Sequence, residues 1–202
     1  MPLDAKGSGV NLANLPPNII DRIEIYKGVV PAHLGADALG GAVNIITNQQ
    51  KKNFLDASYS IGSFHTHQFN LNAQYVTPKA GIIIKPTLSV NYSKNDYKVK
   101  NVEVWNEEKG KYVYEERRRF HDDYFSLLGQ VEVGVTNKKW ADAFFVTASY
   151  SKTDKELQTG AIQTVVYGEA KRKSDSRNIS ATYKKRNFLV DQLDVNALLS
   201  YT

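Results

Sequence analysis

From residue 54 to the end of the chain, apolar and polar side chains alternate with a period of two. Such alternation predicts β-strands whose two faces meet different environments. It occurs in seven runs, at residues 55–61, 68–75, 82–92, 125–135, 144–151, 178–184 and 193–201. The polar positions hold mainly Ser, Thr, Asn and Gln, and most of the apolar faces end in Tyr.

The length and chemistry of these runs favour one class of sheet. Strands that cross a bilayer at a tilt need ~9–11 residues, whereas strands of water-soluble sheets usually have ~5–6. Small polar side chains on one face suit a water-filled lumen, and tyrosines at strand ends suit an aromatic girdle. The pattern therefore predicts a mainly β fold that forms part of an antiparallel transmembrane β-barrel, with about seven strands.

The alternation also predicts which way individual side chains face. We expect lipid contact for Leu71, Ala73, Leu88, Val131, Val146 and Val195. We expect a lumen-facing position for Asn72, Thr87, Gln130, Thr147 and Asn196.

The connections between the runs alternate in length. Those at 76–81, 136–142 and 185–187 are short, whereas those at 93–123 and 154–175 are long. Outer-membrane barrels have short periplasmic turns and longer extracellular loops. Only the connection at 62–65 departs from this pattern, because it is short although it is expected on the extracellular side. Alternation around residues 106–111 predicts a β-ribbon inside the first long loop.

The first 52 residues have a different character. They contain the adjacent prolines Pro16 and Pro17, and glycines that allow tight turns. Residues 19–25 suggest a helical turn that runs into a strand, and residues 42–47 suggest a second strand. The chain therefore divides into a small α/β region at 1–52 and a barrel region at 53–202.

Composition is consistent with a barrel and narrows the alternatives. Apolar residues make up 42% of the 202 residues and the mean hydropathy is −0.43. No run approaches the ~20 apolar residues that a membrane helix needs. The chain has 26 Lys and Arg against 21 Asp and Glu, a net charge of +5 that is dispersed, so nucleic acid is not an expected partner. Cysteine is absent.

The N-terminus lacks the apolar segment of a signal peptide. Because an outer-membrane protein must be exported, we expect the chain to be a fragment or a truncated gene product.

One segment resembles a known family. Residues 18–28 read NIIDRIEIYKG, and a small-residue turn then leads to GGAVNIIT at residues 40–47, just before the first barrel run. This stretch resembles the end of the plug domain of TonB-dependent outer-membrane receptors. Its sequence is most similar to those of receptors from Bacteroidota. The resemblance implies the C-terminal part of a plug followed by the first strands of a barrel that has about 22 strands in the family.

The resemblance also implies a function. Such receptors use an inner-membrane TonB complex to import a scarce, bulky nutrient across the outer membrane of a Gram-negative bacterium. The nutrient is of the siderophore, haem, cobalamin or glycan class. The expected partners are the TonB complex, outer-membrane lipid and lipopolysaccharide, and an unidentified nutrient. No cofactor and no catalysis are expected. The runner-up is a small barrel adhesin or porin-like protein, and a barrel protease comes third.

The resemblance assigns roles to several plug residues. Arg22 and Glu24, two apart on one strand face, are expected to hold the plug inside the barrel through charged hydrogen bonds. Within this chain, their candidate partners on the lumen face are Lys85, Glu132 and Asp194. The geometry of the plug motif is assigned to Gly28, Gly35, Gly40, Gly41 and Asn44. The spacing of these glycines fits neither a dinucleotide fingerprint nor a P-loop.

Three other groups of residues suggest chemistry. His65 and His67 share a strand face in the predicted pattern, but no third metal ligand accompanies them. His121, Asp122 and Asp123 lie where a long loop re-enters the barrel, a position that some outer-membrane proteases use, but no second acidic pair is visible. The basic runs at 117–119 and 171–173 are expected to be solvated loops, with contacts to anionic lipopolysaccharide or to an anionic ligand as the alternative. Trp140 is expected at the membrane interface.

Overall fold

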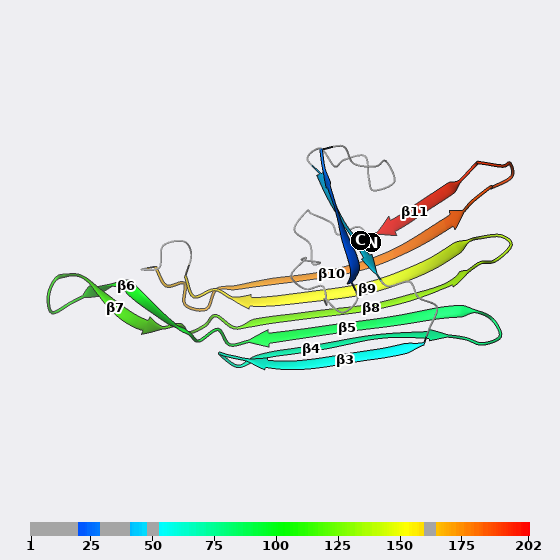
Figure 1. Ribbon diagram of the computed structural model, residues 1–202. Helices are drawn as coiled ribbons and strands as arrows, with labels where there is room; N and C mark the ends of the chain where they lie inside the picture. Colours follow the sequence, from blue (N-terminus) through cyan, green and yellow to red (C-terminus); the bar gives the residue numbers. More distant parts are fainter. Residues whose placement is uncertain (1–19, 29–40, 48–52, 160–164) are drawn as a thin grey trace.

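The computed structural model describes residues 20–28, 41–47, 53–159 and 165–202 (Figure 1). These residues form antiparallel β-strands and no helix, which confirms a mainly β fold. Within the same ranges, no helix has the length and apolar character needed to cross a membrane.

Seven strands form one sheet, in the order β11-β10-β9-β8-β5-β4-β3. Their bounds are β3 (Phe54–Gly62), β4 (Thr66–Val76), β5 (Ile82–Ser93), β8 (Tyr124–Thr136), β9 (Ala143–Glu156), β10 (Lys171–Lys185) and β11 (Val195–Tyr201). Each of the seven predicted runs corresponds to one of these strands. The sheet is open, with β3 at one edge and β11 at the other.

The register divides the side chains into one polar and one apolar face. Across β4, β5 and β8, Asn72 pairs with Thr87 and Thr87 with Gln130. On the other face Leu71 pairs with Leu88. Because directly opposed residues of an antiparallel pair point the same way, the predicted division into two sets is confirmed. Lipid contact by the apolar set remains a prediction.

Burial across the described residues is the reverse of what a water-soluble domain shows. The buried side chains are mostly small and polar, such as Ser89, Ser126 and Ser151, each at most 2% exposed. Large apolar side chains are exposed along the opposite face, for example Val131 at 46% and Leu199 at 75%. Ile83 and Leu128 are the buried exceptions, and both lie on the polar face.

Hydrogen bonds between side chains of neighbouring strands link many of the residues on the polar face. The Ser89 hydroxyl donates to Asn70 Oδ1 at 2.8 Å, and Asn91 Nδ2 donates to Ser126 Oγ at 3.2 Å. One gap interrupts the backbone ladder between β4 and β5, beside Pro86, where pairing passes from Thr87 to Ile84. Proline has no N–H to donate, so a ladder that reaches it loses a hydrogen bond.

Two predicted boundaries are wrong. Strand β10 begins at Lys171 and β9 ends at Glu156, so the loop predicted at 154–175 covers 157–170. The run at 171–177 has no apolar alternation, but its charged residues pair across the strands, as in the 2.9 Å ion pair between Lys171 and Glu156. The turn predicted at 185–187 covers 186–194, so Asp194 lies in a turn and not on the lumen face of a strand.

Strands β6 (Lys98–Asn106) and β7 (Lys111–Arg118) form the predicted ribbon. The ribbon is a separate two-stranded sheet in the connection between β5 and β8. It projects past the ends of those strands, at the end of the sheet opposite the short β8–β9 turn (Figure 1).

Strands β1 (Ile20–Lys27) and β2 (Gly41–Thr47) form a third sheet of their own. The strand predicted at the end of residues 19–25 is confirmed, but the helical turn before it is wrong for the described residues, because residues 20–25 all belong to β1 and their β-branched isoleucines favour a strand. The described part of the predicted α/β region is therefore β only, while Ile19, Gly35 and Gly40 lie outside the described residues. Gly28 and Gly41 have φ angles of +85° and +140°, as the expected backbone role requires.

Candidate functional site

One face of the β1–β2 hairpin carries the Glu24 carboxylate and three hydrogen-bond donors, a group that we call the Glu24 cluster. Glu24 accepts hydrogen bonds from Arg22 Nε at 3.0 Å, from the Tyr26 hydroxyl at 3.0 Å and from Asn44 Nδ2 at 3.1 Å. Three of these residues, Arg22, Glu24 and Tyr26, occupy alternate positions along β1 and share a face. Asn44 is the register partner of Glu24 on β2. The structure thus brings Asn44, which had been assigned to the geometry of the plug motif, together with Arg22 and Glu24, which had been expected to hold the plug in the barrel. Tyr26 was missed, although its spacing from Arg22 and Glu24 already placed it on their face.

These donors keep Glu24 ionised. Hydrogen bonds from Arg22, then Tyr26, then Asn44 lower the pKa of the Glu24 carboxyl below its ordinary value of 4.5. The same contact raises the pKa of Tyr26, because its hydroxyl donates to the carboxylate. The cluster is therefore a pre-formed, charged hydrogen-bonding group on a strand face.

The lowered pKa gives the hairpin a defined pH dependence. A depressed carboxyl pKa contributes stability above the unfolded-state value near 4.5, and this contribution disappears as pH falls through the lower folded-state pKa. We expect amide hydrogen exchange at β1 and β2 to accelerate on acidification through that window, after correction for intrinsic exchange. In a Glu24→Gln variant the acid-dependent part should vanish. An unchanged pH profile in that variant would show that Glu24 does not stabilise the hairpin.

The predicted barrel partners of this cluster have partners elsewhere. Lys85 Nζ lies 3.0 Å from Glu132 Oε1 and 5.1 Å from the centre of the Phe145 ring. Asp194 accepts a hydrogen bond from the Asn187 amide in the β10–β11 turn. The structure pairs Lys85 with Glu132 and Arg22 with Glu24, so a contact between hairpin and barrel stays a prediction.

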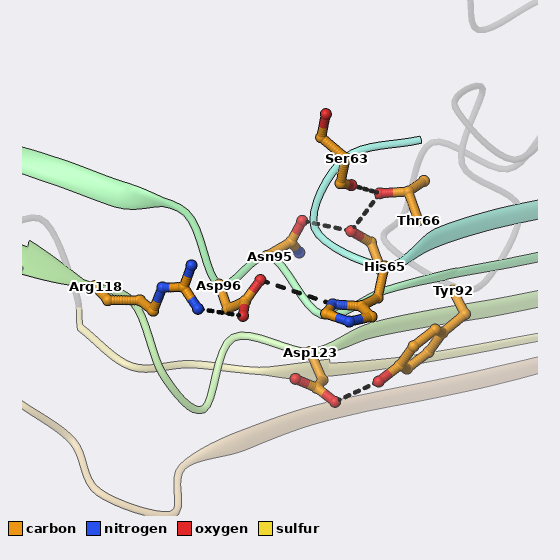
Figure 2. A network of polar contacts seen from close by, with 9 residues as sticks. Ser63, His65, Thr66, Tyr92, Asn95, Asp96, Arg118 and Asp123 are labelled. Atoms are coloured by element: carbon orange, nitrogen blue, oxygen red, sulfur yellow. Dashed lines mark hydrogen bonds and ion pairs between the residues drawn. The ribbon is translucent and has the colours of Figure 1, made fainter. Parts of the chain in front are cut away.

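A second polar network joins the loop ends of the sheet (Figure 2). Asp96, in the β5–β6 connection, lies 3.3 Å from Arg118 Nη1 at the end of β7 and 4.0 Å from His65 Nδ1 in the β3–β4 turn. Beside it, the hydroxyls of Thr66 and Ser93 are 2.8 Å apart. These contacts tie the base of the ribbon to its neighbouring turn.

Asp122 is the most buried carboxylate of this region. Its side chain is 7% exposed and contacts Arg119 Nε at 2.8 Å and Lys155 Nζ at 2.8 Å. Its carbonyl accepts from Asn95 Nδ2 at 3.0 Å. The Arg119 guanidinium also lies 5.4 Å from the centre of the Tyr97 ring. Asp122 therefore links both ends of the ribbon connection to β9.

This geometry gives structural partners to the residues considered for catalysis. Besides the contacts of Asp122, Asp123 accepts from the Tyr92 hydroxyl at 2.9 Å, and His121 Nδ1 lies 3.1 Å from the Gly168 carbonyl oxygen. No serine, threonine or cysteine side chain joins them in these contacts.

The two histidines considered for metal binding lie in different settings. His67 is on β4 and contacts the Tyr59 hydroxyl at 2.7 Å, whereas His65 is in the β3–β4 turn, so the expectation of a shared strand face is wrong. In the part of the chain that the structure describes, no three His, Cys, Asp or Glu residues form a group able to hold a metal ion.

Aromatic rings gather at both ends of the apolar face. At the ribbon end, His67 stacks between Tyr59 and Tyr92, with ring centres 6.2 and 6.5 Å apart. At the short-turn end, Trp140 contacts Phe144 at 5.5 Å and Tyr183 at 6.5 Å. An apolar face bounded by aromatic rings at both ends is typical of a membrane-spanning sheet.

Most cations of the two basic runs have a carboxylate nearby. Arg117 pairs with Glu115, Arg118 with Asp96 and Arg119 with Asp122. Lys171 pairs with Glu156, and Lys173 Nζ lies 3.8 Å from Asp154. These ion pairs account for the basic runs within the fold, and a contact with lipopolysaccharide stays a prediction.

Comparison of the chain with protein-family models, curated proteins and solved structures found no match.

Proposed function

We propose that the seven-stranded sheet is part of a transmembrane β-barrel in the outer membrane of a Gram-negative bacterium. The observation that carries the proposal is the reversed burial, with polar side chains enclosed and Val131, Val146 and Leu199 exposed. Exposed apolar patches of this extent mark a surface that another apolar medium covers. The length of the strands also fits a bilayer. The 12 residues of β5 span about 40 Å, which a tilt of about 40° reduces to the ~30 Å of a bilayer core.

The β1–β2 hairpin has the role of a plug segment in this proposal. A plug must stay seated in a wet lumen and still yield when pulled. Charged hydrogen bonds suit both needs, because water replaces them as they break. The Glu24 cluster supplies such bonds on an exposed strand face, with the Arg22 side chain 61% exposed.

The function that follows is TonB-energised uptake. A scarce, bulky nutrient binds at the outer loops, and an inner-membrane energy complex then pulls on the plug and opens a path through the barrel. The protein makes and breaks no covalent bond in this process, so the proposed activity is transport and not catalysis. The paired carboxylates of Asp122 and Asp123 favour transport over a rim protease, because both serve the fold.

The test is charge reversal at Arg22 in the complete receptor. Arg22→Glu places a second carboxylate beside Glu24, where Arg22 Nε now lies 3.0 Å away, and like charges at that distance repel. We expect vancomycin influx to rise several-fold in cells that carry the variant. Uptake should fall for whichever of four probes, ferrichrome, haem, cobalamin and maltohexaose, the unaltered receptor imports.

Arg117→Glu is the matched control. It makes the same charge change at an exposed ion pair on the ribbon, away from the hairpin, and should leave vancomycin influx unchanged. If influx and uptake stay at their original levels while Arg22→Glu protein is present in the outer membrane, Arg22 is an ordinary solvated residue and the plug role is wrong.

A further inference from the structure

The ribbon carries three exposed aromatic side chains on one face. Trp105 is 52% exposed, Tyr112 54% and Tyr114 70%. Trp105 and Tyr112 are register partners, and their ring centres lie 5.1 Å apart in an edge-to-face arrangement. Tyr114 follows two residues after Tyr112 and therefore points the same way. The rings form a continuous aromatic surface, which we call the aromatic face.

The fold of the ribbon does not account for these rings. The opposite face carries Val102, Val104 and Val113, which are only partly exposed, while the larger rings stay open to solvent. An isolated two-stranded ribbon is marginally stable, so side chains useful for its packing would contact one another or a covering layer. Large rings that stay exposed, with no covering layer among the described residues, are typical of a binding surface.

Charges on the aromatic face limit the chemical classes of ligand that it can bind. Glu103 is the register partner of Tyr114, and Glu116 shares the face, where Lys98 neutralises it at 2.7 Å. The Glu103 carboxylate repels phosphate, sulfate and carboxylate ligands, and it accepts hydrogen bonds from hydroxyl groups. Sugar rings offer both required features, since their C–H faces stack on aromatic rings while their hydroxyls donate outward.

We propose that the aromatic face binds a neutral, soluble oligosaccharide. Rings spread over two strands suit consecutive sugar units of one chain. A soluble sugar is favoured over lipopolysaccharide because the anionic groups of the latter would meet Glu103, and because the ribbon projects past the strand ends (Figure 1).

The base of the ribbon makes this surface a fixed platform. Arg118 is held by Asp96 (Figure 2). The Arg119 amide donates to the Tyr97 carbonyl at 2.9 Å. Asp122 then anchors Arg119 to β9 through Lys155. A pre-organised surface loses less conformational entropy on binding than a mobile loop.

The inference deepens the proposed function by naming a substrate class, but binding itself is measurable without transport. The protein contains two tryptophans, Trp105 and Trp140, so a Trp140→Phe background leaves Trp105 as the only reporter. The full chain in detergent micelles is titrated with maltohexaose and with cellohexaose. We expect a saturable change in Trp105 fluorescence with at least one sugar.

Variants then locate the site. Tyr112→Ala and Tyr114→Ala should each weaken binding about five-fold or more, because each removes one stacking ring. Tyr114→Phe keeps the ring, so it should bind within about two-fold of the parent and report on stacking where an alanine variant folds poorly. Tyr167→Ala removes another tyrosine, 49% exposed outside the ribbon, and should change nothing.

The results that overturn the inference are distinct from failure of transport. Fluorescence that does not change with either sugar, equal binding by the Tyr112→Ala and Tyr114→Ala variants, or preference for lipopolysaccharide over both sugars would each refute it. Saturable binding in micelles by a protein that imports nothing would support the aromatic face as a sugar site and refute the uptake proposal alone.

Discussion

Replacing Val131 by Arg is expected to destabilise the sheet in a membrane by about 2–4 kcal/mol. Val131 lies near the middle of β8, on the apolar face between Pro86 and Ala148, and is 46% exposed. In a water-soluble sheet, a charged residue at such an exposed position changes stability by only about 0.5 kcal/mol. At the bilayer midplane, an outward-facing Arg costs about 2–4 kcal/mol in a barrel strand. The size of the loss in stability therefore distinguishes a lipid environment from an aqueous one.

Gln130→Arg is the matched control, because Gln130 is the adjacent residue on the polar face. Both variants are assembled into phospholipid vesicles with the rest of the receptor, and their unfolding by urea is compared. We expect Val131→Arg to lose about 2–4 kcal/mol and Gln130→Arg to lose less than about 1 kcal/mol. Equal losses, or a larger loss for Gln130→Arg, would mean that the apolar face does not contact lipid.

Removing the Asp122 carboxylate is expected to loosen the ribbon from the sheet. Asp122→Ala leaves Arg119 and Lys155 without their shared partner, while their side chains are only 18% and 28% exposed. Breaking a buried ion pair costs about 3–5 kcal/mol, and because these cations are partly solvated we expect about 2–4 kcal/mol. Amide hydrogen exchange should accelerate at Arg119 and Glu156, whose amides bond to Tyr97 and Asp123.

Asp154→Ala is the comparison for an exposed pair. Asp154 lies on β9 as well, but Lys173 is 3.8 Å away and 69% exposed, so its loss should cost less than about 1 kcal/mol. If Asp122→Ala is no more destabilising than Asp154→Ala and the two exchange rates stay unchanged, Asp122 does not anchor the ribbon.

The strands were predictable because their signal is local. Alternation such as Leu71-Asn72-Ala73-Gln74 needs no knowledge of neighbours, and β4 contains it as expected. The start of β10 has no such signal, since the residues 171–177 are all polar or charged. Only the partner strand shows that this segment is extended: Lys171 faces Glu156 and Lys173 faces Asp154.

The candidate sites were predictable in part for the same reason. Arg22 and Glu24 share a face by spacing alone, and Tyr26 follows the same rule. The contact between Asn44 and Glu24 depends on the register of the hairpin. The spacing of residues along one strand does not determine that register. Lys85 and Glu132 share the polar face of the sheet, but their mutual ion pair was not foreseen, because it requires the β5–β8 register across the whole ribbon.

The sequence by itself determined that seven strands follow residue 53, which side chains within the alternating runs share a face, and that a ribbon lies in the connection between β5 and β8, while it misplaced some strand ends. These properties follow from the two-residue period of an extended backbone and from local turn chemistry. The tertiary structure alone decided which side chains meet: Glu24 with Asn44, Lys85 with Glu132, and Asp122 with Lys155. Such contacts depend on strand register, which the hydrophobic pattern and the turn geometry set together and which pairs residues that lie far apart in the chain.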